Sequence, residues 1–179
     1  MQQRTHTCGE LTEKNINEVV SLCGWVHTRR DHGGLIFIDL WDKYGLTQVV
    51  LNPQIDQLAH QEAHSLRGNF VISVCGKVRT RPKDMVNPKL KTGCIEVFIE
   101  ELKILNPSNT PPFTGWEHQE VGESTRLKHR YLDLRSDELQ KNLELRYQIT
   151  RITRKVLDEA RFIEIETPIL TKSTPEGAR

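Results

Sequence analysis

The stretch VVSLCGWVHTRRDHGGLIFIDLW, residues 19–41, decides the fold, because apolar residues alternate with small or polar ones on both sides of a Gly-Gly pair. A period of two is the pattern of a β-strand with one buried face. It predicts strands over residues 19–30 and 35–41, joined by a turn at residues 31–34. Ile36, Ile38 and Leu40 then face the core, and Phe37 and Asp39 face outward.

The following segments repeat this pattern, with one helical interruption. A third strand is predicted over residues 46–51, and two more over residues 70–81 and 95–105. Between the third and fourth strands, residues 55–67 carry apolar residues at helical spacing, and Gly68 follows where a helix end favours glycine. Five strands with a helix between the third and fourth are the layout of an OB-fold, a mainly β, Greek-key barrel that binds oligonucleotides.

The last third of the sequence has a different composition. Residues 107–125 are rich in Pro and Gly without periodicity, which indicates a hinge or linker. A charged helical segment follows, with a capping-box-like sequence at residues 137–140, and Pro168 ends a short strand at residues 162–168. One helix and one strand cannot bury a core. We therefore expect residues 1–106 to form the barrel and residues 126–179 to be the truncated start of an α+β domain.

The composition argues against several classes of protein. The formal net charge of +1 gives no global positive field, so nucleic-acid binding would rest on local patches. The sequence has neither an apolar run of the roughly 18 residues that span a membrane nor a signal peptide, which favours a cytoplasmic protein without membrane contact. The four cysteines form no Cys-x-x-Cys pair, and Gln61 stands where a zincin His60–His64 motif needs Glu. We expect reduced thiols and no metal site.

The outward positions of the strands suit single-stranded nucleic acid. A splayed base stacks on an aromatic ring such as Phe37, while polar side chains contact its Watson–Crick edge. Alternation also turns Gln48 and Glu96 outward, and the basic residues available for phosphate contacts are Arg29, Arg30, Lys77, Arg79 and Arg81. The alternative for Phe37 is a second apolar layer beneath the helix or a neighbouring domain.

Several motifs resemble the class II aspartyl-tRNA synthetases of the bacterial type. Cys23-Gly-Trp-Val, Gly34-Leu-Ile-Phe-Ile-Asp and Gly45-Leu-Thr-Gln-Val are similar to their N-terminal anticodon-binding domain. Arg130-Tyr-Leu-Asp-Leu-Arg resembles the segment that opens their catalytic domain. The segment from Phe162 to Arg179, which ends in Thr-Pro-Glu-Gly-Ala-Arg, resembles class II motif 1 and the loop after it. The order and spacing of these motifs make the resemblance specific, and the Thr-Pro-Glu-Gly-Ala-Arg ending favours this family over the related asparaginyl and lysyl enzymes.

The resemblance implies a role for each matching residue. Phe37 would stack on the central anticodon base, Arg30 and Gln48 would contact that uridine's edge, and Glu96 and Arg81 would contact neighbouring bases. Arg29, Lys77 and Arg79 keep the phosphate contacts expected above. His32 and Asp84 would lie where tRNA(Asp) and tRNA(Asn) are discriminated. In the C-terminal part, Pro168 would lie at the interface of a homodimer and Glu176 would contact the substrate aspartate.

The resemblance also implies a reaction for the whole enzyme. Aspartate and ATP, with Mg²⁺, would give aspartyl-adenylate, and the aspartyl group would pass to tRNA(Asp), with tRNA(Asn) considered as a second substrate. The family's ATP-binding motifs would lie beyond residue 179, so we expect no catalytic residue, no bound cofactor and no activity in these 179 residues. The alternatives are a sister synthetase, a free-standing single-strand binder and an interaction fragment that dimerises through residues 137–170.

Overall fold

The computed structural model describes residues 3–115, 120–170 and 172. The chain divides into two compact units, Met1–Pro111 and Pro112–Arg179. The division predicted from the sequence, with a linker at residues 107–125, stays a proposal. Helix α2 (Glu123–Lys128) begins inside that predicted linker.

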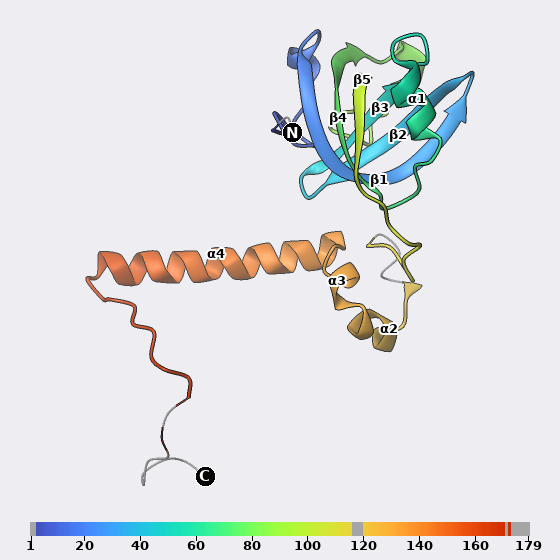
Figure 1. Ribbon diagram of the computed structural model, residues 1–179. Coiled ribbons are helices and arrows are strands. Elements are labelled where there is room, and N and C mark those ends of the chain that lie inside the picture. Colours follow the sequence, from blue (N-terminus) through green and yellow to red (C-terminus); the bar gives the residue numbers. More distant parts are fainter. Residues whose placement is uncertain (1–2, 116–119, 171, 173–179) are drawn as a thin grey trace. The chain divides into compact units, whose positions relative to one another are not determined.

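The first unit is a closed β-barrel with the strand order β1-β2-β3-β5-β4 (Figure 1). Neighbouring strands are antiparallel except β3 and β5, which run parallel, and β1 is long enough to pair with both β2 and β4. The strands are β1 (Val19–His32), β2 (Leu35–Asp42), β3 (Gly45–Leu51), β4 (Val71–Thr80) and β5 (Ile95–Asn106). The five-stranded OB-fold predicted from the alternation is confirmed.

The core of the barrel follows the predicted alternation on β2, β4 and β5. Ile36, Ile38 and Leu40 are buried on β2, and the residues between them are only half-buried. Ile72, Val74 and Val78 are likewise buried on β4, and Ile95, Val97 and Ile99 are buried on β5. Burying one apolar face on a common core is what a barrel of short strands needs, because each strand alone is unstable.

A β-bulge in β1 changes the direction of its side chains. The pairing with β2 shifts between Val26 and Thr28, so one extra residue, His27, enters β1. Beyond the bulge, Arg30 pairs with the outward Phe37, whereas Arg29 pairs with the inward Ile38. The two neighbouring arginines therefore lie on opposite faces of the sheet, because successive side chains of a strand alternate.

The turn between β1 and β2 is shorter than predicted. Both strands extend to the glycine pair, so Asp31 and His32 belong to β1. Gly33 and Gly34 have φ angles of 58° and 79°. Two successive residues with positive φ define the two-residue hairpin turn that matches the twist of the strands, and glycine adopts this conformation without steric cost.

Helix α1 (Gln57–Ala63) lies between β3 and β4, as predicted, but it is shorter than the predicted range 55–67. Asp56 caps its N-terminus by accepting hydrogen bonds from the backbone N–H groups of Leu58 and Ala59, at 2.8 and 3.1 Å. The helix ends at His64 rather than at Gly68. Ala59, Ala63 and the following Leu66 join the core, whereas Leu58 remains exposed.

Two short 3₁₀ helices complete the first unit. Helix η1 (Glu13–Asn15) precedes β1, and Thr12 caps it. Helix η2 (Lys83–Met85) lies in the loop between β4 and β5.

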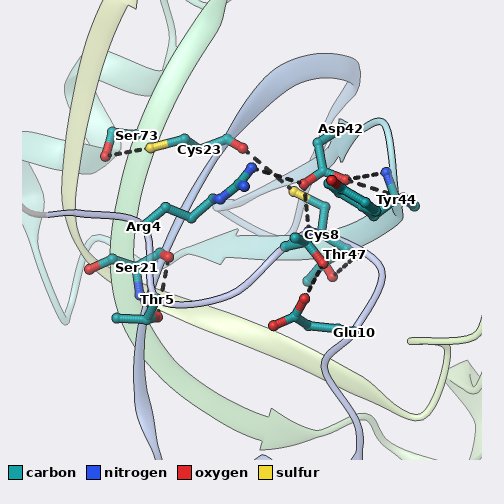
Figure 2. A network of polar contacts seen from close by, with 12 residues as sticks. Arg4, Thr5, Cys8, Glu10, Ser21, Cys23, Asp42, Tyr44, Thr47 and Ser73 are labelled. Carbon is teal, nitrogen blue, oxygen red and sulfur yellow. Dashed lines mark hydrogen bonds and ion pairs between the residues drawn. The ribbon is translucent and has the colours of Figure 1, made fainter. Parts of the chain in front are cut away.

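The segment before η1 is attached to the barrel by buried polar contacts (Figure 2). One carboxylate oxygen of Asp42 accepts from the backbone N–H of Cys8 at 2.9 Å, and the other accepts from the N–H groups of Tyr44 and Gly45. The Thr47 hydroxyl donates to the Cys8 carbonyl at 2.6 Å. Cys8 and Leu11 thereby enter the hydrophobic core.

All four cysteines lie within the described ranges and are free thiols. Burial is the main reason why the pKa of Cys8 lies far above its ordinary value, and the Asp42 carboxylate raises it further. A thiol held protonated in this way is a poor nucleophile.

The second unit contains α2, α3 (Arg130–Asp133) and α4 (Asp137–Glu159). Ser136 caps α4 by accepting from the Leu139 N–H, so the cap predicted at Asp137 lies one residue too late. The predicted strand at residues 162–168 is wrong, since these residues are irregular and exposed. An isolated strand has no partner for its backbone groups. No helix in the described part of the chain is long and apolar enough to cross a membrane.

Candidate nucleic-acid interface

The outer face of the barrel carries a chain of polar contacts across β1, β2, β3 and β5. Arg30 donates through Nη2 to the Asp39 carboxylate at 2.9 Å and to the Gln48 side-chain oxygen at 3.4 Å. Gln48 in turn donates through Nε2 to the Glu96 carboxylate at 2.9 Å. The register aligns these residues, because Asp39 is opposite Gln48 and β3 runs parallel to β5.

This chain of contacts fixes the orientation of the Gln48 amide. Its oxygen points toward a cation and its nitrogen toward a carboxylate, so rotating the amide by 180° would break both interactions. Arg30 keeps most of its five N–H donors available, since only its Nη2 is engaged within the described part of the chain and half of its side chain is exposed. The cluster therefore presents oriented donors and acceptors next to an aromatic ring, because Phe37 is the cross-strand partner of Arg30.

Glu96 is more buried than the sequence predicted. Strand alternation turns it outward, yet only 7% of the residue is exposed. This burial raises the pKa of Glu96, and the Gln48 hydrogen bond and the charges of Arg81 and Arg79 partly oppose the shift. A carboxylate in this position is a strong acceptor for a donor that reaches it, because little water competes.

Arg81 also departs from the sequence prediction. It was expected to face outward at the end of the fourth strand, but β4 ends at Thr80 and Arg81 is buried. Its Nε donates to the Ile95 carbonyl at 2.9 Å, which turns the side chain toward β5 and Glu96. Its Nη2 is buried and has no hydrogen-bond partner among the described residues. Burial also lowers the pKa of this guanidinium, against the charge of Glu96.

Arg29, which the sequence grouped with Arg30 as a phosphate contact, lies away from this cluster, and its predicted role stays a prediction. Its Nε donates to the carbonyl of Ala63 on α1 at 2.9 Å, and its Nη2 contacts Asp31 and His64. Only 19% of its side chain is exposed. The bulge in β1 explains the difference, because it turns Arg29 to the face that α1 covers.

The other predicted residues have the following positions. Lys77 and Arg79 lie on β4, where Lys77 is half-buried and Arg79 is exposed. His32 is exposed at the end of β1, Asp84 is exposed in η2, and Pro168 is exposed in the irregular segment after α4. Glu176 lies outside the described residues. None of these positions tests the predicted roles, which stay predictions.

Two residues of this face carried no role in the sequence analysis. Asp39 anchors Arg30, and only the three-dimensional pairing reveals this. Phe98 lies under Arg79, whose guanidinium carbon is 4.3 Å from the ring centroid. Alternation could have identified Phe98, because its neighbours Val97 and Ile99 are both in the core.

The described residues contain no group of three or more His, Cys, Asp or Glu side chains that could hold a metal ion. What the side chains of the outer face offer a ligand is hydrogen bonding, stacking and charge.

Comparison with protein families gives two matches. The family described as "OB-fold nucleic acid binding domain" matches residues 20–105, and the family described as "tRNA synthetases class II (D, K and N)" matches residues 122–179. Together the two matches cover most of the chain.

Curated relatives are similar over almost the whole chain. The aspartate–tRNA(Asp/Asn) ligase of Oleidesulfovibrio alaskensis is 55% identical over 176 residues, which are 98% of this chain and 29% of the relative. The enzyme of the same name from Salinibacter ruber is 54% identical over 180 residues, again 98% and 29%. The chain therefore spans less than a third of the length of these relatives.

Solved structures share the fold at low identity. The aspartyl-tRNA synthetase of Entamoeba histolytica gives a TM-score of 0.81 at 19% identity over 97% of this chain and 41% of that chain. The asparaginyl-tRNA synthetase of Pyrococcus horikoshii, complexed with asparaginyl-adenylate, gives 0.79 at 22% identity over 99% and 39%.

Proposed function

Since the chain belongs to the family of class II aspartyl-tRNA synthetases, we propose that its barrel binds the anticodon loop of the tRNA that the whole enzyme aminoacylates. The observation that carries the proposal is the oriented cluster of Arg30, Gln48 and Glu96 beside Phe37 on the outer face of the barrel. The relatives are tRNA ligases by name, which supports tRNA as the class of ligand.

Phe37 and the cluster would contact different parts of the central base. The ring of Phe37 provides a stacking surface that accepts any base. A uridine edge offers O4 as acceptor and N3–H as donor, which complement an Arg30 donor and the Gln48 oxygen. The amide orientation set by Glu96 keeps that oxygen on the side of Arg30. The network thus favours uridine without a rearrangement of Gln48.

Glu96 and Arg81 would contact the bases on either side. A carboxylate accepts from a cytosine amino group or from guanine N–H donors. Arg81 has a buried Nη2 group without a hydrogen-bond partner among the described residues, and a base oxygen could accept from it. Arg29 is better placed to hold α1 against β1 than to contact phosphate.

The whole enzyme would use this binding to select the tRNA that receives aspartate. It would activate aspartate with ATP and Mg²⁺ and transfer it to tRNA(Asp), as a cytoplasmic homodimer with Pro168 at its interface and Glu176 near the substrate amino group. The groups that bind ATP and Mg²⁺ would belong to the remainder of the enzyme, where the motifs of the family that hold the nucleotide lie. The contribution of the barrel to the reaction is the choice of tRNA.

We extend the proposal to tRNA(Asn), whose anticodon differs from that of tRNA(Asp) in the third base. The relatives are named for both tRNAs. His32 is exposed beside the Gly33–Gly34 turn, and an imidazole that both donates and accepts need not reject either pyrimidine. The test is the binding of this chain to stem-loops with the anticodons GUC and GUU. We expect affinities within about tenfold, and a difference of several hundredfold would refute the extension.

The central test is the binding of the GUC stem-loop to wild-type chain and to Phe37→Ala. We expect the substitution to weaken binding by about 1–3 kcal/mol through lost stacking. Tyr44→Ala is the matched control, because Tyr44 is an exposed aromatic residue in the turn between β2 and β3. The proposal is wrong if Phe37→Ala binds as tightly as wild type. Equal binding of GUC and GAC loops would indicate a non-specific single-strand binder instead.

A further inference from the structure

A second aromatic residue lies on the same outer face as Phe37, two strands away. Phe37 on β2 is opposite Val50 on β3, and Val50 is opposite Phe98 on β5. Since neighbouring strands are about 4.8 Å apart, the two aromatic positions are separated by about 10 Å. Both point outward, because the residues next to them along β2 and β5 lie in the core.

Val50 shows that this part of the outer face is an apolar platform. The side chain is fully buried, yet it does not belong to the core cluster that contains its neighbours Val49 and Leu51. Helix α1 and the side chains beside Val50 on the neighbouring strands are the groups available to cover it. The flanking positions across the sheet are those of Phe37 and Phe98.

Basic side chains border the Phe98 end of this platform. Arg79 lies over the ring, with its guanidinium carbon 4.3 Å from the centroid, and Arg79 is also opposite Glu96 in the pairing of β4 with β5. Lys77 is directly opposite Phe98. A guanidinium this close to an aromatic face gains a cation–π interaction, and Arg79 is at the same time exposed to solvent.

We propose that Arg79 and Phe98 form a second stacking surface, which holds the nucleotide adjacent to the one that stacks on Phe37. The inference rests on the proposed function and deepens it. Bases stack on guanidinium planes as well as on aromatic rings. Arg79 therefore acts through its plane rather than as the phosphate contact expected from the sequence, and Lys77, which has no such plane, supplies the phosphate contact for the same nucleotide.

Stacking by the guanidinium plane of Arg79 and phosphate binding by its charge predict different effects of one substitution. Arg79→Lys keeps the positive charge but removes the plane, so it separates stacking from phosphate binding. Phe98→Leu keeps an apolar cover for Val50 but removes the ring. Lys77→Ala is the matched control, because it removes a charge from the neighbouring position on β4.

The experiment measures binding of the 179-residue chain to the GUC stem-loop and to a series of loops, each with one abasic nucleotide. We expect Arg79→Lys and Phe98→Leu each to weaken binding to the intact loop by about five- to 150-fold, the range for the loss of one stacked base. On one loop of the series, these two substitutions should cause no further loss of affinity. In that loop the abasic nucleotide is the neighbour of the nucleotide whose base stacks on Phe37. Their salt dependence should match wild type, whereas Lys77→Ala should lower the salt slope by about one unit.

Three outcomes would overturn the inference. Wild-type affinity for Arg79→Lys, together with a reduced salt slope for Arg79→Ala, would make Arg79 a phosphate contact only. An equal loss on every abasic loop for Phe98→Leu would make the ring structural, and urea unfolding of each variant checks this independently. The inference would also be refuted, with the proposed function intact, if removal of one base abolished the effect of Phe37→Ala but removal of no base abolished the effect of Phe98→Leu or Arg79→Lys. Failure of the wild-type chain to bind any loop would refute the proposed function itself.

Discussion

Asp42 is the strongest single test of how the N-terminal segment is held to the barrel. Its carboxylate accepts three backbone N–H bonds, from Cys8, Tyr44 and Gly45, and only 5% of its side chain is exposed. In Asp42→Ala these donors lose their partner. Tyr44 is exposed, so water can replace the carboxylate at the turn. Cys8 is fully buried, so its N–H group stays unpaired.

The magnitude follows from this difference. A buried donor without a partner costs about 1–3 kcal/mol, and each of the two turn bonds contributes about 0.5–1.5 kcal/mol. We therefore expect Asp42→Ala to lower the free energy of unfolding by about 2–6 kcal/mol. Arg4→Ala is the control, because Arg4 is partly exposed and 3.6 Å from the same carboxylate. Arg4→Ala leaves the three N–H bonds to the carboxylate in place, so removing this partly exposed ion pair should cost about 1 kcal/mol, less than Asp42→Ala costs.

The assay is urea unfolding followed by tryptophan fluorescence, since Trp25 and Trp41 lie on β1 and β2 with ring centroids 5.3 Å apart. Asp42→Asn adds a second comparison. Its amide keeps one acceptor oxygen where the carboxylate uses both, so its stability should fall between wild type and Asp42→Ala. The reasoning is refuted if Asp42→Ala unfolds within about 0.5 kcal/mol of wild type, or if Arg4→Ala is equally destabilised.

Three further predictions concern the outer face and the second unit. Burial raises the pKa of Glu96, so the folded state binds this proton more tightly than the unfolded state does. The free energy of unfolding should therefore fall as the pH rises from 4.5, the ordinary pKa, through the raised pKa of the folded state. Glu96→Gln should remove this part of the pH dependence in urea unfolding and weaken binding of the GUC loop; an unchanged stability profile would contradict the first half. Lys77→Ala should weaken binding to cognate and non-cognate RNA stem-loops alike, and a changed base preference in a competition assay would speak against a phosphate contact. Ser136→Ala should lower the stability of α4 by about 1 kcal/mol, visible as reduced helical circular dichroism on heating. Thr150→Ala in the helix interior is the control, which should melt no lower than wild type because alanine favours the helix more than threonine does.

The alternation of apolar residues was sufficient to predict the barrel and most of its core. Ile36, Ile38 and Leu40 face inward as expected, because each strand must bury one face. Alternation did not predict the direction of the side chains in β1, where the strand is irregular. The bulge at Val26 and Thr28 turns Arg29 toward α1, and no local signal in the sequence distinguishes Arg29 from Arg30.

The candidate site was predictable in its residue types but not in its contacts. Phe37, Gln48 and Arg30 lie together on one face as expected. The burial of Glu96 and Arg81 depends on how β4 and β5 end and pair, which residues far apart in sequence determine. The role of Asp39 as an anchor arises only from the register of β2 against β1 and β3.

The attachment of residues 4–11 affects how the barrel should be excised for use by itself. The family match begins at residue 20, yet Cys8 and Leu11 lie wholly inside the barrel. A fragment begun at β1 would open a hole in the hydrophobic interior and leave the Thr47 hydroxyl without the Cys8 carbonyl. The region that the family model matches is thus shorter than the region that fills the core of the barrel. A portable version of this scaffold has to start at or before Arg4.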